Sequence, residues 1–280
     1  DRYTLVGFTS TFDQNVASLT MAKLIKDLYP HVTIVFGGAN YDSEMGLEYF
    51  RAFPFIDHVV VGEGEEAFPR LVRYVLNEKT GALPPGVTGR QGSDILFAPN
   101  ETLYSDFSKT GPPDYDDYYH LLAELGQTAQ GLDRILLYEA SRGCWWGEKH
   151  HCTFCGLNAQ SMAFRSKSPQ QAAEEMAYLS QRYDTARFRL VDNIIDMKYV
   201  DELFGKFASN YCDLDVFIET KSNLRKSQIR TLAAGGVKCM QPGLESLSLS
   251  QLKAMDKGVT PMQNIACLKW SAYYRIAVSW

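Results

Sequence analysis

Hydrophobic and polar positions alternate between two patterns along the first 77 residues, one typical of strands and one typical of helices. Short runs rich in β-branched residues, such as 32–38 (VTIVFGG) and 58–62 (HVVVG), are separated by stretches such as 16–28 (VASLTMAKLIKDL), whose apolar positions have helical spacing. Strands that are apolar almost throughout are typical of a parallel sheet covered by helices on both faces. This region predicts a β-α-β-α-β-α module of the doubly wound type.

Residues 79–133 differ, because glycine, proline and polar residues surround short apolar pieces. Such composition predicts a connector, at most with a small hairpin. From residue 134 the alternation resumes, with apolar strands at 134–141, 186–192, 215–221, 237–243 and 274–280. About five βα repeats indicate part of a parallel barrel. We therefore predict an α/β chain with three parts, a module (1–78), a connector (79–133) and a partial barrel (134–280).

Composition narrows the function classes. The 280 residues are 45% hydrophobic and 22% charged, which suffices for large cores without disulfides. Lys and Arg number 28 against 33 Asp and Glu, and no basic run is present, so nucleic acid is not an expected partner. No apolar run reaches the ~20 residues that span a bilayer, and the N-terminus lacks a signal-peptide layout. A cytoplasmic location is expected.

Three of the six cysteines lie close together, as Cys144, Cys152 and Cys155, with the spacing Cys-x7-Cys-x2-Cys. Three thiolates in one loop can each bind one iron of a [4Fe–4S] cubane and leave the fourth iron open. The alternative is a structural zinc site of these three cysteines with His150 or His151. The other cysteines are scattered through apolar segments and are expected in the core.

Polar residues follow the predicted barrel strands, where barrel enzymes carry their chemistry. Asp192 and Asn193 follow the second strand, Glu219 and Lys221 end the third, and a Gly-Leu-Glu-Ser turn (243–246) follows the fourth. Each set also has a structural interpretation. Asp-Asn is a common helix cap, and Glu219 with Lys221 could form a surface ion pair. If their side chains point toward a cofactor or substrate at this end of the barrel, Glu219 and Lys221 are the candidate catalytic groups.

The segment 136–158 (LLYEASRGCWWGEKHHCTFCGLN) resembles the cluster loop of radical S-adenosylmethionine (SAM) enzymes. Its seven-residue first gap is similar to the branch that matures ribosomally made peptides. The resemblance implies that Cys144, Cys152 and Cys155 hold a [4Fe–4S] cluster whose open iron binds SAM. An electron from the cluster then cleaves SAM to a 5′-deoxyadenosyl radical, so an electron donor such as a flavodoxin or ferredoxin is implied as a partner.

The same resemblance implies further cofactor contacts in the barrel. Phe154 would pack beside the adenine of SAM, although it could equally be a core aromatic. Asp192 and Asn193 would lie near the methionine amino group. The turn resembles a Gly-Ile-Glu-Ser turn near the SAM ribose and carboxylate, with Gly243, Glu245 and Ser246 as its members.

The N-terminal module is similar to the last three strand-loop units of the cobalamin-binding domain that precedes the barrel in this branch. By that analogy the corrin would be lined by the small and polar residues after each strand, namely Thr9, Ser10, Thr11, Gly37, Gly38, Gly62, Glu63 and Gly64. The resemblance also implies missing strands at both ends, so that the fold would be a partial Rossmann-like module followed by a partial (β/α)6 barrel.

Together these features predict a cobalamin-dependent radical SAM methyltransferase that methylates an unactivated carbon of a ribosomal precursor peptide. Two alternatives stay open. One is a cobalamin-binding radical SAM enzyme that cyclises, rearranges or epimerises its substrate. The other is a non-catalytic binding protein stapled by zinc.

Overall fold

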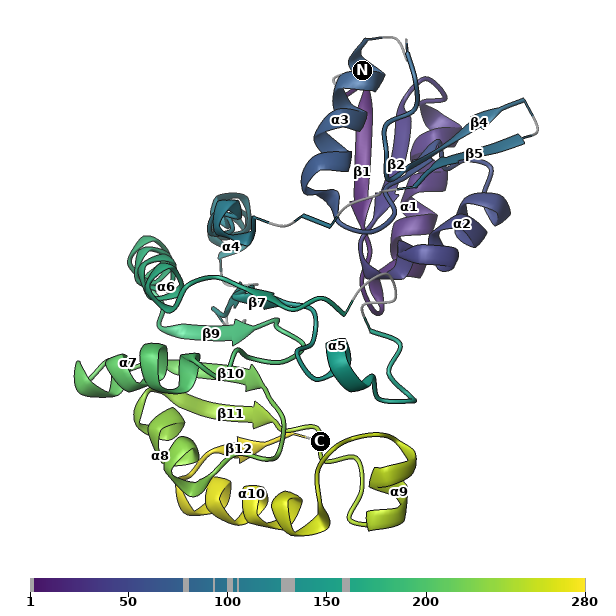
Figure 1. Ribbon diagram of the computed structural model, residues 1–280. Coiled ribbons are helices and arrows are strands. Elements are labelled where there is room, and N and C mark those ends of the chain that lie inside the picture. The colour runs from purple at the N-terminus through teal and green to yellow at the C-terminus, as the bar shows by residue number, and fades with distance from the viewer. Residues whose placement is uncertain are drawn as a thin grey trace. The chain divides into compact units, whose positions relative to one another are not determined.

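The computed structural model of the chain describes residues 3–77, 81–92, 94–99, 103–104, 106–126, 134–157 and 162–279 (Figure 1). It divides into two compact units, Asp1–Ser105 and Asp106–Trp280. The ends predicted for the connector, residues 79 and 133, lie outside the described residues. The three-part division of the sequence therefore stays a prediction, and each unit is taken by itself below.

Unit 1 contains a parallel sheet in the order β1-β2-β3, with Phe8 of β1 opposite Phe36 of β2 and Phe36 opposite Val59 of β3. Helices and a 3-10 turn connect the strands, and an antiparallel hairpin of β4 and β5 follows. The elements are β1 (Leu5–Thr9), α1 (Gln14–Leu28), β2 (Thr33–Gly37), η1 (Ala39–Tyr41), α2 (Ser43–Ala52), β3 (His58–Val59), α3 (Gly64–Leu76), β4 (Val87–Gln91) and β5 (Asp94–Ala98).

Both faces of this sheet are buried, because successive residues of β2 point to opposite sides. Ile34 and Phe36 pack in a core with Ala22 of α1 and Phe50 of α2. Val35 packs in a second core with the buried residues of α3. Helices thus cover both faces, as the nearly continuous apolar pattern of the strands predicts.

The third strand is shorter than its sequence pattern indicates. The apolar run reaches Val61, whereas β3 ends at Val59. Val60 instead forms an antiparallel bridge with Val87 at the start of the hairpin, and the Val61 N–H donates to the Gly86 carbonyl. The apolar run is buried throughout. Val60 still donates its N–H to the Phe36 carbonyl of β2 at 2.8 Å, and only Val61 is held by the chain next to the hairpin alone.

Unit 2 contains a five-stranded parallel sheet in the order β12-β11-β10-β9-β6. Its principal elements are α4 (Asp116–Leu125), β6 (Leu136–Tyr138), α6 (Pro169–Tyr183), β9 (Arg187–Leu190), α7 (Gly205–Ser209), β10 (Asp215–Glu219), α8 (Lys226–Ala234), β11 (Val237–Gln241), α9 (Leu249–Ala254), α10 (Pro261–Tyr273) and β12 (Ala277–Val278). Five further short elements are η2 (Phe107–Lys109), β7 (Ser141–Arg142), α5 (Gly147–His150), β8 (Arg165–Ser166) and the π-helical turn η4 (Val200–Phe204).

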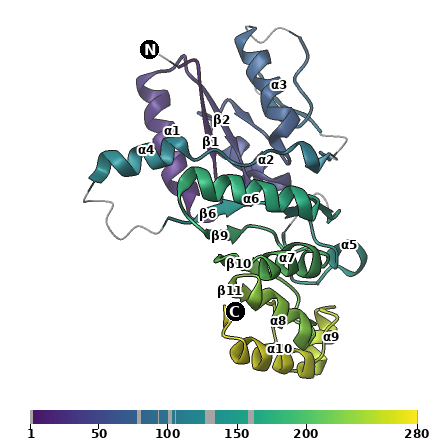
Figure 2. The same cartoon turned by 90° about the vertical axis from the view of Figure 1, so that its left-hand side faces the viewer.

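Helices α6, α7, α8 and α10 cover one face of this sheet (Figure 2). Alternate strand residues such as Phe188, Leu190 and Ile218 face these helices and form the main core. The opposite face carries Leu137 and Val191, each 51% exposed. The sheet is therefore packed on one side and accessible on the other.

The sequence also determines where the longer helices begin. Ser168 caps α6 by accepting a hydrogen bond from the Gln171 N–H, with Pro169 in the first turn. Thr260 and Gln263 form a capping box at the start of α10.

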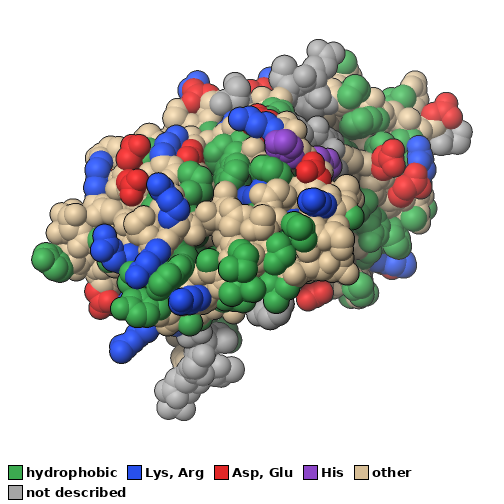
Figure 3. All heavy atoms as spheres, turned by 60° about the horizontal axis from the view of Figure 1, so that its bottom comes forward, with side chains coloured by type: hydrophobic (Ala, Val, Ile, Leu, Met, Phe, Trp, Pro, Cys, Tyr) green, Lys and Arg blue, Asp and Glu red, His purple; other side chains and the backbone are tan. Residues whose placement is uncertain are grey.

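On the face that Figure 3 shows, Lys and Arg side chains are interspersed with hydrophobic, acidic and neutral ones. No helix among the described residues has both the length and the apolar character needed to cross a bilayer.

Candidate functional site

The cysteine loop follows the short strand β7 and is shaped by tight backbone contacts. Gly143 has φ of +85°, and a Cβ there would overlap the Ala163 carbonyl, so only glycine fits. The single turn of α5 fills the gap between Cys144 and Cys152. Two hydrogen bonds then fix the loop, from Trp146 Nε1 to the Asp256 carbonyl (3.0 Å) and from the Thr153 N–H to the Met255 carbonyl (3.1 Å).

All three thiols of the loop are free and half-buried. The Gly147 N–H donates to Cys144 Sγ at 3.3 Å, a contact that stabilises a thiolate. Burial raises the pKa of the Cys152 thiol, and the charges of Cys155 and Cys144 raise it further, whereas the ammonium groups of Lys257 and Lys221 lower it. The three cysteines therefore lie close enough to influence one another, and the ammonium groups of Lys257 and Lys221 lie near them, where they could offset the charge of thiolate ligands.

The histidines that a zinc site would need have other partners. The His150 ring stacks on Trp146 with ring centroids 4.3 Å apart, and a ring nitrogen of His151 lies 3.1 Å from the Cys155 carbonyl. In the part of the chain that the structure describes, no three His, Cys, Asp or Glu side chains form a group that could hold one metal ion. That observation concerns a single ion, because the thiolates of a cubane bind separate irons.

Lys221 is the most distinctive polar group beside this loop. It follows β10, is 4% exposed, and its Nζ atom has no hydrogen-bond partner among the residues described. The neighbouring hydroxyl of Thr220, 6% exposed, has none there either. Burial lowers the pKa of Lys221 to about 8, while the Cys152 thiolate opposes this shift. A buried donor without a partner is costly, so this end of β10 fits an anionic or polar ligand.

Lys257 brings together two of the predicted cofactor contacts. Its Nζ atom lies 2.8 Å from Glu245 Oε1 and 5.4 Å from the centroid of the Phe154 ring. Phe154 is 52% exposed, so it is not a core aromatic. The cysteine loop and the 243–246 turn therefore meet at Lys257, a residue that the motifs did not single out.

A second residue that the sequence interpretation missed, Asn264, holds the 243–246 turn through hydrogen bonds. Asn264 of α10 is fully buried and donates through Nδ2 to the carbonyls of Leu244 and Ser246, both at 2.8 Å. Its Oδ1 accepts from the Ser222 hydroxyl at 2.5 Å. The ends of β10 and β11 are thus joined through one amide. The one sequence signal for Asn264 is its place in the first turn of a helix that begins with a capping box.

The remaining predicted members of the turn lie beside these contacts. Gly243 and Glu245 have φ of +53° and +58°, so the backbone turns sharply here. The Ser246 hydroxyl donates to Gln251 Oε1 at 2.5 Å and accepts from the Ser248 N–H at 3.0 Å. Ser246 is therefore held within its own loop.

Asp192 lies at the predicted strand end, but its side chain points into the protein interior. It is fully buried, and its two oxygens accept hydrogen bonds from the Ala140 N–H and the Ser141 hydroxyl, both at 2.8 Å. Burial raises the pKa of Asp192 to about 7, partly offset by these hydrogen bonds. The carboxyl group thereby ties the end of β9 to the chain that leads into the cysteine loop. Its predicted contact with SAM stays a prediction, as does that of the half-buried Asn193.

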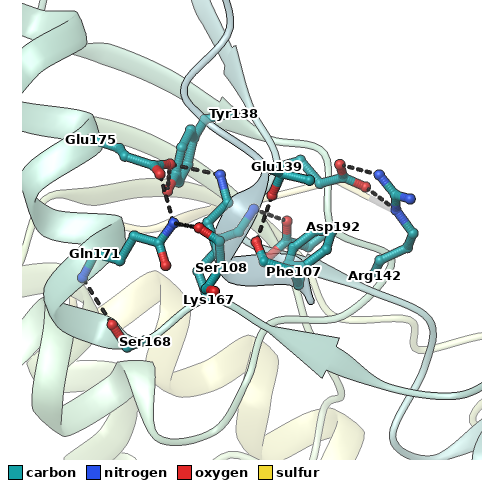
Figure 4. A network of polar contacts seen from close by, with 12 residues as sticks. Phe107, Ser108, Tyr138, Glu139, Arg142, Lys167, Ser168, Gln171, Glu175 and Asp192 are labelled. Atoms are coloured by element: carbon teal, nitrogen blue, oxygen red, sulfur yellow. Dashed lines mark hydrogen bonds and ion pairs between the residues drawn. The ribbon is translucent and has the colours of Figure 1, made fainter. Parts of the chain in front are cut away.

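Behind β6 a buried network supports the same segment (Figure 4). Lys167 Nζ lies 2.6 Å from Glu175 Oε2, which also accepts from the Tyr138 hydroxyl at 2.7 Å. Gln171 donates to the other Glu175 oxygen at 2.9 Å. The Tyr199 hydroxyl lies 3.0 Å from the Ala140 carbonyl and 2.9 Å from the Lys167 carbonyl, so its one proton is shared between them. These contacts fix the residues that lead into the cysteine loop. They do not occupy the accessible face of the sheet.

Glu219 lies on that open face at the end of β10. It is half-buried, burial raises its pKa, and no hydrogen bond or ion pair of its carboxylate is found within the described ranges. Glu219 and Lys221 do not form the surface ion pair that was the alternative interpretation. Their catalytic role stays a prediction.

In unit 1 the predicted cofactor residues lie together at the carboxyl edge of the three-stranded sheet. Gly38 has φ of +90°, and a Cβ there would come within 2.7–2.8 Å of the Ser10 backbone. Asn40 Nδ2 donates to Ser10 Oγ and to the Phe12 carbonyl, both at 3.0 Å. The first two loops are thereby locked together, and Ser10 is fully buried between them.

The other predicted residues of this edge are more accessible. Thr9 and Gly38 are exposed, and Thr11, Gly37, Gly62, Glu63 and Gly64 are half-buried. Glu63 Oε2 accepts from the Tyr104 N–H at 2.7 Å, and a Cβ at Gly64 would meet open space. The loop after β2 that contains Gly37 and Gly38, here called the glycine loop, is closely packed. It fits a flat ligand laid across the strand ends, the usual place for ligands of open α/β sheets.

No protein-family model matches the chain. It is 26% identical over 271 residues to an uncharacterized methyltransferase of Pyrococcus horikoshii, covering 95% of this chain and 56% of that protein. Its structure is similar to the cobalamin-dependent S-adenosylmethionine radical enzyme OxsB with aqua-cobalamin bound, with a TM-score of 0.76, 17% identity and coverage of 98% of this chain and 40% of that one.

A third similarity is to the radical S-adenosylmethionine methyltransferase TsrM from Kitasatospora setae with cobalamin and a [4Fe-4S] cluster bound. Its TM-score is 0.71 at 16% identity, covering 99% of this chain and 56% of that one. The chain thus spans about half the length of these proteins. The structural similarities confirm the predicted α/β fold class, because the chain matches structures of cobalamin-dependent radical SAM enzymes along nearly its whole length, and they are consistent with a partial barrel.

Proposed function

We propose that the chain is the cofactor-binding part of a cobalamin-dependent radical SAM methyltransferase that acts on an unactivated carbon of a ribosomally made precursor peptide. The observation that carries the proposal is that three neighbouring free thiols lie beside the buried Lys221 ammonium group, which has no hydrogen-bond partner in the part of the chain that the structure describes. A cluster site next to a buried ammonium group that has no hydrogen-bond acceptor among the described residues suits a cofactor that carries a carboxylate.

The chain's own residues have distinct tasks in this proposal. Cys144, Cys152 and Cys155 would hold the cluster, which supplies the electron that cleaves SAM. Lys221 and Thr220 would donate to the polar end of SAM, Phe154 would cover its adenine, and the turn at Glu245 would border its ribose. Trp146 and the docked loop would keep water away from the reacting groups.

The glycine loop of unit 1 would hold the corrin, and cobalamin would supply the methyl group when bound. Gly38 and the Ser10–Asn40 contacts would keep the loop backbone flat enough for close approach. The precursor peptide as substrate is supported by the seven-residue first gap of the cysteine loop. A flavodoxin or ferredoxin would deliver the electron in the cytoplasm, where reduced thiols persist.

The test uses the full-length parent protein, reconstituted with iron and sulfide without oxygen. We expect about four irons and four sulfides per chain, and no bound zinc in their place. With SAM, a reductant, methylcobalamin and the precursor peptide, we expect 5′-deoxyadenosine together with a peptide heavier by one CH2 group. Deoxyadenosine with a peptide of unchanged or lower mass would support a cyclising, rearranging or epimerising enzyme instead.

Matched variants separate the cluster cysteines from the others. Cys152→Ala should lose most of the iron, whereas Cys212→Ala, which changes a half-buried thiol packed against the main core, should keep it. Equal iron contents in the two variants, or a single zinc in the wild type, would contradict the proposal.

A further inference from the structure

The accessible face of the unit 2 sheet has an ordered row of side chains across its strands. Leu137 of β6 is opposite Arg189 of β9, and Arg189 is opposite Phe217 of β10. Phe217 is in turn opposite Cys239 of β11. Because strand residues alternate between faces, this row points away from the core helices. Val191, two residues beyond Arg189, continues the apolar surface and is 51% exposed.

Arg189 is the one cation in this row, and no acidic group neutralises it in the described part of the chain. Its guanidinium carbon lies 5.2 Å from the centroid of the Phe217 ring, and no ion pair or hydrogen bond of its side chain is found there. Arg187, two residues earlier on the same face, differs because its Nε atom lies 3.3 Å from Asp215 Oδ2. One arginine of the strand is therefore paired and the other is open.

A half-buried guanidinium group with only an aromatic neighbour favours an incoming anion. Its planar donors match the two oxygens of a carboxylate, and the low polarity around Leu137 and Phe217 strengthens such a contact. The side chains around it are apolar, so the ligand should carry an apolar body next to its charge.

We infer that Arg189 is a substrate-binding residue that holds a carboxylate of the substrate, with Phe217, Leu137 and Val191 packing against the adjoining apolar part. This inference rests on the proposed function, since it places the substrate on the open face of the sheet. Glu219 lies two residues beyond Phe217 on β10, or about 7 Å farther along the strand. The carboxylate is thus bound nearer the start of β10 than Glu219 and Lys221 are. The reacting carbon lies nearer the carboxyl end of the strand.

The test uses a matched pair of probes, indole-3-acetate and its neutral amide, indole-3-acetamide. Binding to the full-length protein is measured by calorimetry without SAM or cluster. The acid should bind at least about tenfold more tightly than the amide, because only the acid forms the charge-assisted pair. In Arg189→Gln this preference should vanish, and Arg189→Lys should retain part of it.

Arg187→Gln is the matched control, because Arg187 is on the same face but already paired. It should keep the preference for the acid, and circular dichroism should show that all variants are folded. Equal binding of acid and amide by the wild type, no binding of either, or the same loss in both glutamine variants would overturn the inference. The readout needs neither cluster nor turnover, so its failure is distinct from a failure of the methyltransferase proposal.

Discussion

The Nζ atom of Lys221 lies 2.8 Å from the centroid of the Trp146 ring. Trp146 belongs to the long gap between the first two cysteines and is itself fixed by its hydrogen bond to the Asp256 carbonyl. Trp146 therefore places an aromatic face directly against the buried cation. Such a contact favours the charged form of lysine, although it does not replace a hydrogen-bond acceptor.

Replacing Lys221 by methionine should have opposite effects on stability and on ligand binding. The cofactor-free protein should gain stability, because the substitution removes a buried donor for which the described residues offer no acceptor. The dissociation constant for SAM on reconstituted protein should rise by about tenfold or more, the loss of one charge-assisted hydrogen bond. Thermal unfolding and equilibrium dialysis measure the two effects. Lys226→Met, which removes a cation lying over Trp270, is the control and should leave SAM binding unchanged.

The glycine loop of unit 1 allows an equally sharp comparison. Gly38→Ala should destabilise the protein by about 1–3 kcal/mol, because alanine is strained at φ of +90° and its Cβ would press on the Ser10 backbone. Gly64→Ala should be nearly neutral, since a Cβ there meets nothing within 4 Å. Urea unfolding measures both, and absorbance titration with cobalamin should show weaker binding for Gly38→Ala alone. Equal effects would mean that the loop is not a closely packed cradle.

Local patterns were enough to predict the elements and the cysteine loop, because strand periodicity and cysteine spacing are encoded over a few neighbouring residues. The contacts that complete the site were not predictable in this way. Lys257 reaches Phe154 and Glu245, and Asn264 reaches Ser222, only after the helices have packed on the sheet. Asp192 illustrates the same limit, because its place after β9 was predicted whereas its inward orientation was not.

Asp192 should make stability depend on pH in a definite direction. Its pKa in the folded protein, about 7, lies above the ordinary value of 3.8. The folded state therefore favours the protonated carboxyl, and this contribution is complete below about pH 4 and is lost as the pH rises through 7. Relative to Asp192→Asn, the wild type should lose on the order of 4 kcal/mol across that range. Urea unfolding of cofactor-free protein at several pH values measures the difference, and a constant difference would contradict the assignment.

Asn264 offers a test of how the turn at 243–246 is held. Leucine has the same branching and number of side-chain heavy atoms but no polar atoms, so Asn264→Leu would leave the Ser222 hydroxyl and the carbonyls of Leu244 and Ser246 without their buried partner. The expected cost is about 2–4 kcal/mol in the free energy of unfolding. Asn264→Asp should restore only the acceptor for Ser222 and bring a buried carboxyl, so it should be destabilised increasingly as the pH rises. Hydrogen exchange should show faster opening of residues 244–248 in the leucine variant, while the helix start at Thr260 keeps its capping box and its protection. If the turn exchanged as slowly as in the wild type, the link between the ends of β10 and β11 would have to come from elsewhere, because no other side chain described here bonds to both Ser222 and the turn.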